Sequence, residues 1–202
     1  QNNLSIAYPS SQRARANKAV ATALLSRVYL YLKDYPNAEI QATAIISNSD
    51  YKMETLDNAF LNTSTEVIWQ RFTFSGFTTF GANFVPSGTV PNYVLYPSLA
   101  SSFELTDQRI VKWMKPLFIG TEQYYYPNKY KLRTATAGNE YNVMLRLAEQ
   151  YLIRAEARAQ LEKITGSGSA AEDLNEVRFR AGLLGTTATT KNTMLLAIEN
   201  ER

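Results

Sequence analysis

The sequence has no cysteine and no histidine among its 202 residues. Without cysteine it can form neither a disulfide nor a thiolate metal site. The two absences together exclude nucleophilic catalysis by a Ser-His or Cys-His pair, and they exclude the usual zinc sites. Any chemistry would have to use carboxylates, lysine, tyrosine or a cofactor, and nothing in the sequence indicates a cofactor or a metal.

Strong charge asymmetry and long apolar runs are also missing. The 21 basic and 18 acidic residues give a formal net charge of +3, and no run of four or more like charges occurs. This excess of positive charge is too small to indicate a nucleic-acid partner. No apolar stretch approaches the roughly 18 residues that a transmembrane helix needs. With 45% hydrophobic residues, the chain is long enough to bury a sizeable core as one globular domain.

The C-terminal part has the clearest helical periodicity. Between positions 142 and 184, apolar or small residues recur at spacings of three and four, as at Leu145, Ala148 and Leu152. This pattern predicts a helix over 143–161. Ser169 and Glu172 form a Ser-x-x-Glu capping box that starts a second helix over 170–181, and Gly182 suits its left-handed C-cap.

The N-terminal part predicts a similar pair of helices. One helix over 11–33 would be capped by Ser10 or Ser11, and a second over 36–47 would begin at Pro36. Small residues between large ones, on a period near 34, are typical of tetratricopeptide hairpins. A last helix is expected over 191–202. Two hairpins are fewer than the three or so that a stable array usually needs, so we expect an incomplete domain.

Residues 51–141 differ in character. They hold eight of the nine Phe, both Trp and five of the seven Pro, and they have little helical periodicity. We expect a strand over 66–74, another over 129–133, and a short helix over 98–111 with Phe103 and Leu105 inward. The predicted fold class is therefore mostly α. It consists of tetratricopeptide-like hairpins in 1–50 and 142–202 and a loop-rich aromatic insertion with a few short strands in 51–141.

Aromatic residues of this insertion are the candidate ligand-binding side chains. Their flat rings offer the apolar surface on which the C–H face of a sugar stacks, and neighbouring Gly, Pro, Asn and Thr suggest exposed loops. The alternative for each ring is core packing, which we expect for Trp69 in the strand-like run. The candidates are Trp113, Tyr124, Tyr125, Tyr126, Phe77 and Phe80.

Pairs of carboxylates suggest a further possibility. A glycosidase needs two carboxylates about 5 to 10 Å apart in one cleft. Glu104 with Asp107, and Glu172 with Glu176, have spacings that fit one helix face. Glu172 already has a capping role, however, and sequence spacing alone is weak evidence for a catalytic pair. We expect structural roles for these acids and for Arg178 and Arg180.

Several motifs in a fixed order resemble those of a known family. At the C-terminal end they are LRLAEQYLIRAEA, NEVRFRAGL and LLAIENER; further upstream they are RANKAVATALLSRVYLYLKDYPNAE, TEVIWQR and FELTDQR. The chain resembles the SusD/RagB family of bacterial outer-membrane nutrient-binding lipoproteins, in its C-terminal portion.

The resemblance implies a surface protein of a Bacteroides-type bacterium that binds a glycan without cleaving it. It also implies a TonB-dependent, SusC-like transporter as partner. Because no cysteine is present, membrane attachment would need an anchor outside this segment. Two alternatives remain open: a tetratricopeptide-type scaffold that binds a protein or peptide, and a carboxylate glycosidase.

Overall fold

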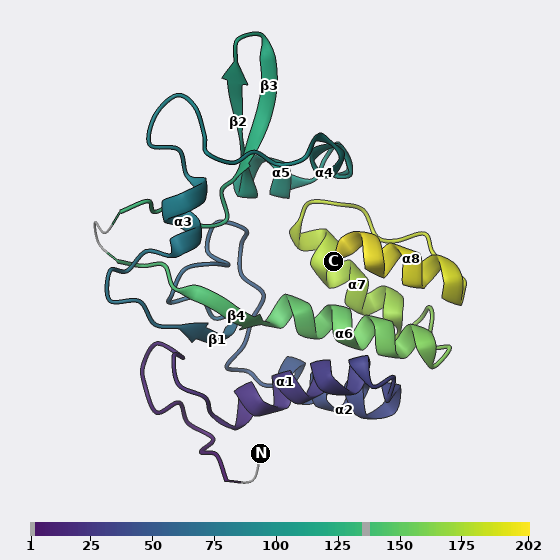
Figure 1. Cartoon of the computed structure of the whole chain (residues 1–202). Coiled ribbons are helices and arrows are strands. Elements are labelled where there is room, and N and C mark those ends of the chain that lie inside the picture. The colour runs from purple at the N-terminus through teal and green to yellow at the C-terminus, as the bar shows by residue number, and fades with distance from the viewer. Residues whose placement is uncertain (1–2, 135–137) are drawn as a thin grey trace.

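The computed structural model describes residues 3–134 and 138–202. Figure 1 shows a layer of stacked helices on one side and an irregular region with two small sheets on the other. The helices are α1 (Lys18–Tyr31), α2 (Tyr35–Ile46), α3 (Thr79–Phe84), α4 (Pro97–Ser101), α5 (Gln108–Trp113), α6 (Leu147–Gln160), α7 (Ala170–Arg180) and α8 (Lys191–Glu201). The strands are β1 (Val67–Arg71), β2 (Met114–Ile119), β3 (Glu122–Pro127) and β4 (Asn142–Arg146).

The helical layer consists of two hairpins that pack side by side. Helix α1 packs on α2, α2 packs on α6, and α6 packs on α7 and α8. Alanines at these contacts are fully buried, including Ala23, Ala38, Ala42 and Ala157. Because an alanine side chain takes little space, it lets two helices approach closely. The mostly α, tetratricopeptide-like fold class is confirmed, and α6 joins hairpins that are about a hundred residues apart in the sequence.

The helix ends follow the local sequence signals closely. The predicted helices over 36–47, 170–181 and 191–202 each agree with the structure to within one residue. Gly182 has φ +77°, and the Leu183 N–H donates to the Arg178 carbonyl at 3.0 Å, which forms the predicted left-handed cap. Only half of the predicted capping box forms. Ser169 accepts from the Glu172 N–H, but the Glu172 carboxylate accepts from Gly168.

The predicted start of the first helix was wrong. Helix α1 begins at Lys18, where the Asn17 side chain accepts a hydrogen bond from the Val20 N–H at 3.0 Å. The preceding segment instead runs beside β1. Arg13, with φ +51°, accepts from the Gln70 N–H, and its guanidinium donates to the Thr65 carbonyl at 3.0 Å. A backbone engaged along a strand in this way cannot continue a helix.

The helix predicted over 143–161 was also wrong at its start. Residues Asn142–Arg146 form β4, which pairs antiparallel with β1, and α6 starts only at Leu147. Leu145 is buried as predicted, but it packs from a strand opposite Trp69. The strand predicted over 66–74 forms over the shorter range Val67–Arg71. A partner about 75 residues away in the sequence decides this local structure.

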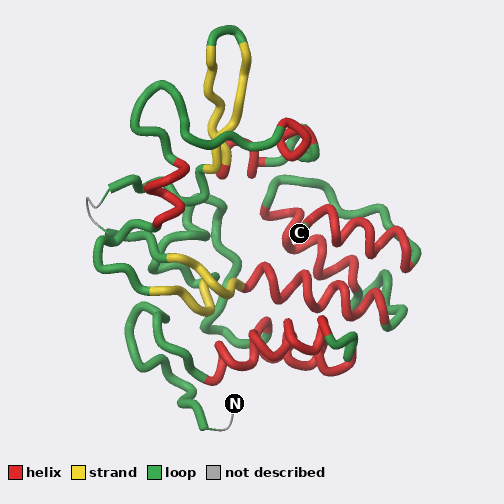
Figure 2. Tube along the Cα trace, in the orientation of Figure 1, coloured by secondary structure: helices red, strands yellow, loops and turns green. Residues whose placement is uncertain are grey.

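The insertion contains an antiparallel hairpin that was not predicted from the sequence. Strands β2 and β3 pair from Met114 opposite Pro127 to Ile119 opposite Glu122, and they project away from the body (Figures 1 and 2). No strand forms over 129–133. The helix predicted over 98–111 is two short helices, α4 and α5. Leu105 lies between them and is fully exposed rather than inward.

A buried carboxylate connects the helical layer to the insertion. The Glu66 side chain is fully buried just before β1. It accepts hydrogen bonds from Arg146 at the end of β4 and from Arg180 at the end of α7, the latter at 2.7 and 2.8 Å. The backbone N–H of Glu54 donates to the same carboxylate at 3.3 Å. One side chain therefore holds two strands and a helix end together.

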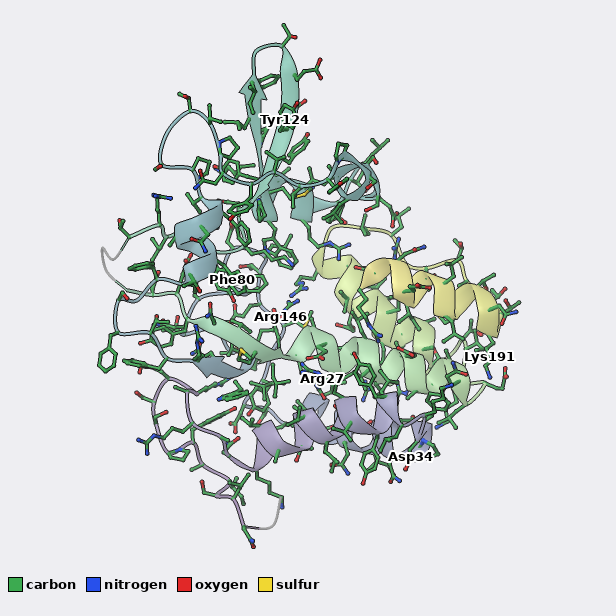
Figure 3. The ribbon with its side chains drawn as sticks, in the orientation of Figure 1. Arg27, Asp34, Phe80, Tyr124, Arg146 and Lys191 are labelled. Carbon is green, nitrogen blue, oxygen red and sulfur yellow. The ribbon has the colours of Figure 1, made fainter. Side chains whose placement is uncertain are left out.

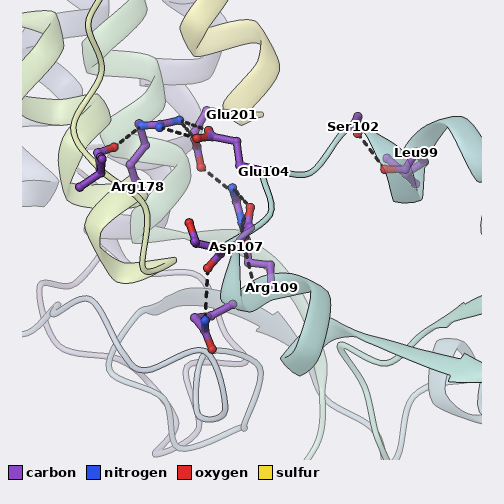
Figure 4. A network of polar contacts seen from close by, with 10 residues as sticks. Leu99, Ser102, Glu104, Asp107, Arg109, Arg178 and Glu201 are labelled. Atoms are coloured by element: carbon purple, nitrogen blue, oxygen red, sulfur yellow. Dashed lines mark hydrogen bonds and ion pairs between the residues drawn. The ribbon is translucent and has the colours of Figure 1, made fainter.

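A second ionic network ties α5 to the last two helices (Figure 4). Arg109 contacts Asp107 at 2.7 Å and Glu201 at 2.6 Å, and both acids are buried. Arg178 contacts Glu104 at 2.7 Å and Glu201 at 3.3 Å. Arg178 and Arg180 thus have the structural roles expected of them; Arg178 binds the insertion and α8, whereas the ion pair of Arg180 is with Glu66 of the insertion.

The hairpin core predicts a mutational effect. Leu152 is 7% exposed and packs in the cluster formed by α6, α7 and α8. Leu152→Ala should lower the free energy of unfolding by about 2 to 5 kcal/mol, because it removes buried methyl groups and leaves a cavity. Chemical denaturation measures this change. Leu184→Ala, at a position 85% exposed, is the control; equal effects at the two positions would contradict the assigned packing.

Removing the charge of Glu66 should destabilise the fold about as much as Leu152→Ala, but through lost ion pairs instead of lost packing. Glu66→Gln keeps the side-chain shape but leaves Arg146 and Arg180 without their countercharge. It should cost about 3 to 5 kcal/mol of unfolding free energy, as expected when one member of a buried ion pair is removed. The exposed Glu199→Gln is the control, with an expected change within about 0.5 kcal/mol. A denaturation midpoint for Glu66→Gln close to that of the unaltered chain would disprove the role assigned to this carboxylate.

Candidate ligand-binding surface

Helix α3 is a short helix that is fixed at both ends. The Thr78 side chain accepts from the Gly81 N–H at 2.9 Å, and Arg133 donates to the carbonyls of Ala82 and Val85 at 2.7 and 3.0 Å. A Cβ at Gly81 would lie 2.2 Å from the Leu132 carbonyl oxygen, so only glycine allows this close approach. Helix α3 is therefore held in place at both ends and at Gly81.

Four rings form a continuous group around α3, which we call the aromatic ladder: Phe80, Phe84, Tyr93 and Tyr130. Phe80 stacks against Phe84 with a centroid distance of 6.0 Å, and against Tyr130 at 5.9 Å. Tyr93 meets Phe84 edge to face at 5.5 Å. Phe80 is 49% exposed and Tyr93 is 56% exposed. The ladder therefore presents rigid aromatic surface to solvent.

The ring contacts continue from the ladder into the core. Tyr130 contacts Phe60 at 5.4 Å, and Phe60 contacts Trp113 at 5.3 Å. Trp113 is only 7% exposed, packs with Leu56 and Ala59, and donates its indole N–H to the Leu56 carbonyl at 2.8 Å. The expectation of an exposed loop position for Trp113 was wrong, because residues 56–60, distant in sequence, cover it.

The other sequence candidates occupy different places. Tyr124, Tyr125 and Tyr126 are half-buried on β3 rather than on a loop, and the Leu95 N–H donates to the Tyr125 carbonyl at 2.6 Å. Figure 3 places Tyr124 on the projecting hairpin, well away from Phe80. Phe77 is half-buried just before α3. Of the six candidates, only Phe80 belongs to the ladder, and the structure does not gather the six into one site.

Three ladder residues were missed by sequence reasoning. Phe80 and Phe84 have the i, i+4 spacing of one helix face, so an expected helix over 79–84 would have linked them. Tyr93 and Tyr130 come from irregular segments far apart in the sequence, and no local pattern relates them. No helix was predicted over 79–84, and for that reason the spacing of Phe80 and Phe84 was not recognised.

The acidic residues considered as a catalytic pair are engaged in structural contacts. Glu104 binds Arg178, and Asp107 binds Arg109 and caps α5 by accepting from the Arg109 N–H at 2.8 Å. Glu172 accepts from the Gly168 N–H at 2.7 Å. Within residues 3–134 and 138–202, no group of three or more acidic side chains is arranged to hold a metal ion.

Positive charges gather where the ring contacts enter the core. The centres of Lys129, Arg146 and Arg180 lie 5.2, 5.7 and 5.5 Å from the Trp113 ring centroid, and we call these three residues the cation cluster. Lys129 is exposed, but the protein around it lowers its pKa to about 8. Desolvation is the largest cause, followed by repulsion from Arg146, Arg109 and Arg180.

Two surface grooves lie elsewhere, on the helices. One, of about 620 Å³, is lined by Pro36, Glu39, Ile40, Thr43, Leu161 and Lys163. The other, of about 310 Å³, lies along α8 and the segment before it. None of the aromatic candidates lines either groove. In the described part of the chain, no helix has both the length and the apolar character that a membrane span requires.

The sequence matches one family model, and the structure matches solved structures with related names. Residues 112–202 match the model of the SusD family. A SusD superfamily protein from Bacteroides thetaiotaomicron has a TM-score of 0.79 and 20% identity, with 100% of this chain and 52% of that chain covered. A SusD-like carbohydrate binding protein from Bacteroides vulgatus has a TM-score of 0.76 and 20% identity, with 98% and 44% covered.

A third solved structure is a surface glycan-binding protein A from Bacteroides uniformis. Its TM-score is 0.73 at 20% identity, and the match covers 98% of this chain and 50% of that chain. This chain thus spans about half the length of the solved structures it matches. A search of curated proteins gives no match. Residues 112–202 therefore match the SusD family in sequence, and nearly the whole chain shares the fold of the solved SusD superfamily proteins.

Proposed function

We propose that this chain is the scaffold and part of the binding surface of a protein that captures a glycan without cleaving it. The proposal places the whole protein at the outer-membrane surface, attached through an anchor outside this segment, where it works with a TonB-dependent, SusC-like transporter. The match of residues 112–202 to the SusD family supports it, as do the names of the similar carbohydrate binding and surface glycan-binding proteins. In this proposal residues 1–202 are one incomplete SusD-like domain.

The observation that carries the proposal is the half-exposed Phe80 on the aromatic ladder. A sugar ring has few charges, so its affinity comes from stacking of its C–H face on aromatic surface together with hydrogen bonds. Phe80 is supported by two stacked rings and stands on a helix fixed at both ends. Because the support is rigid, little conformational entropy would be lost on binding.

Within the proposed surface, Phe80 and Tyr93 are the direct stacking residues. Phe77 precedes the same helix, and Tyr124, Tyr125 and Tyr126 would form a separate contact on the β2–β3 hairpin. Trp113 would act only indirectly, by supporting Phe60 and through it Tyr130. The structural engagement of Glu104, Asp107 and Glu172 favours binding over hydrolysis, since a glycosidase needs two carboxylates free to act on one bond.

A second candidate function is a helical scaffold that binds a protein or peptide. It is favoured by an apolar stripe on the outer face of α1, where Leu24, Val28 and Tyr31 are exposed at a spacing of three and four. Such a stripe is typical of a helix that packs against a further element. Glycan binding that is lost on changing Tyr31 but kept on changing Phe80 would shift the site to this face.

Substitution of the central ring tests the proposed surface. Phe80→Ala should weaken binding of the cognate polysaccharide by about 1 to 3 kcal/mol, the range known for bases stacked on aromatic side chains. The melting temperature should change little, because Phe80 is half-exposed. Retardation in glycan-loaded gels and thermal melts measure the two quantities. Tyr31→Ala, an exposed aromatic change on α1, is the matched control and should leave binding intact; equal retardation of all three proteins would contradict the proposed surface.

Incubation with the bound polysaccharide tests the non-catalytic part of the proposal. The polymer should be recovered at its original length after prolonged contact with the pure protein, as measured by size-exclusion chromatography. Steady release of shorter oligosaccharides would instead favour the glycosidase. In that case substitution of Glu104 and of Asp107 by the corresponding amides would identify the acids responsible.

A further inference from the structure

The cation cluster has more positive charge than its acidic neighbours can balance. Arg146 and Arg180 share the single carboxylate of Glu66. Arg109, which also repels Lys129, is neutralised separately by Asp107 and Glu201. Among the described residues no carboxylate pairs with Lys129, whose charged group meets only the rings of Phe60 and Trp113. Three cations therefore face one carboxylate.

Such crowding destabilises the fold unless something else compensates for it. Like charges near one another raise the free energy of the folded state, and repulsion from the arginines adds to desolvation, the larger cause, in lowering the pKa of Lys129. In addition, the Arg180 Nε–H is buried and has no hydrogen-bond partner. A buried unpaired donor is uncommon and destabilises the fold. The chain thus carries an electrostatic cost here that its own residues do not offset.

The hydrogen-bond donors that the cation cluster leaves unused suit a singly charged acceptor. Arg146 and Arg180 each donate to Glu66 through one nitrogen, Nη1, whereas Lys129 is an exposed residue whose ammonium makes no hydrogen bond in the described part of the chain. An ammonium binds a carboxylate as a point charge without demanding a bidentate geometry. Arg146 keeps 21% of its side-chain surface exposed and adds to the positive potential at the same place.

This charge lies next to the aromatic ladder. Tyr130, which follows Lys129 directly in the chain, stacks on Phe80, and it also contacts Phe60, over which the Lys129 ammonium lies at 5.8 Å. We propose that Lys129, assisted by Arg146, binds the carboxylate of an acidic sugar in the glycan that stacks on Phe80. The ligand class is thus an acidic, uronate-containing glycan, and the inference rests on the proposed function.

Binding of two matched oligosaccharides tests the inference. The full chain is titrated calorimetrically with tetragalacturonate and with the neutral galactotetraose. The acidic tetramer should bind about tenfold or more tightly than the neutral one, as expected for a charge-assisted hydrogen bond. Lys129→Gln should remove most of this preference. Its melting temperature should stay the same or rise, because the substitution relieves repulsion. Lys52→Gln, at another exposed lysine, should change neither quantity.

The pH dependence gives a second readout. Lysine is charged below its pKa, so raising the pH from 7 to 9 crosses the pKa of about 8 and should weaken binding of tetragalacturonate, while binding of galactotetraose stays constant. The groups that face Lys129 do not explain such a loss. The charged groups around it are Glu66 and the guanidinium groups of Arg109, Arg146 and Arg180, and arginine side chains are not deprotonated in proteins; burial raises the pKa of Tyr130. Lys129→Gln should abolish the pH effect.

These experiments distinguish failure of the acidic-sugar site at Lys129 from failure of the proposed glycan binding. Equal affinity for both tetramers, unchanged by Lys129→Gln but lowered by Phe80→Ala, would overturn the acidic specificity and leave glycan binding intact. Binding of neither tetramer nor of neutral polysaccharides would count against both proposals. Full displacement of tetragalacturonate by acetate at the same carboxylate concentration would show a simple anion site, and would likewise overturn an acidic-sugar site.

Discussion

The ion pairs of Glu66 are the interaction on which the arrangement of the whole molecule depends. A fully buried carboxylate is tolerated only when its charge is compensated, and here Arg146 and Arg180 supply that compensation from a strand end and a helix end. Through this contact the end of β4, and with it the start of α6, is fixed relative to β1. The helical layer and the irregular insertion therefore share one ionic junction, and each part constrains the other.

The helices act as a scaffold for the aromatic residues of the insertion. The ionic network of Arg109 with Asp107 and Glu201 fixes α5 against α8, and α5 ends at Trp113. Trp113 supports Phe60, Phe60 supports Tyr130, and Tyr130 supports the exposed Phe80. A surface ring is thus linked to the core by successive ring contacts. This link gives the proposed stacking surface the rigidity that loops alone would lack.

The sequence predicted what depends on local chemistry. The cap at Gly182, the start of α8 at Lys191 and the burial of Leu152 follow from residues within a turn or two of each position. It did not predict what depends on distant partners. Residues 142–146 form a strand because β1 lies beside them, and Trp113 is buried because residues 56–60 cover it. Of the ladder, only Phe80 was expected, since Tyr93 and Tyr130 join it through tertiary packing.

The most direct measurement is a crystal structure of the chain with bound tetragalacturonate. The account predicts one sugar ring in contact with the face of Phe80, and a uronate carboxylate within hydrogen-bonding distance of Lys129 Nζ. Glu66 should remain bound to Arg146 and Arg180, because the ligand uses the charge that these pairs leave uncompensated. A ligand bound elsewhere, with Phe80 and Lys129 both free of contact, would contradict the account.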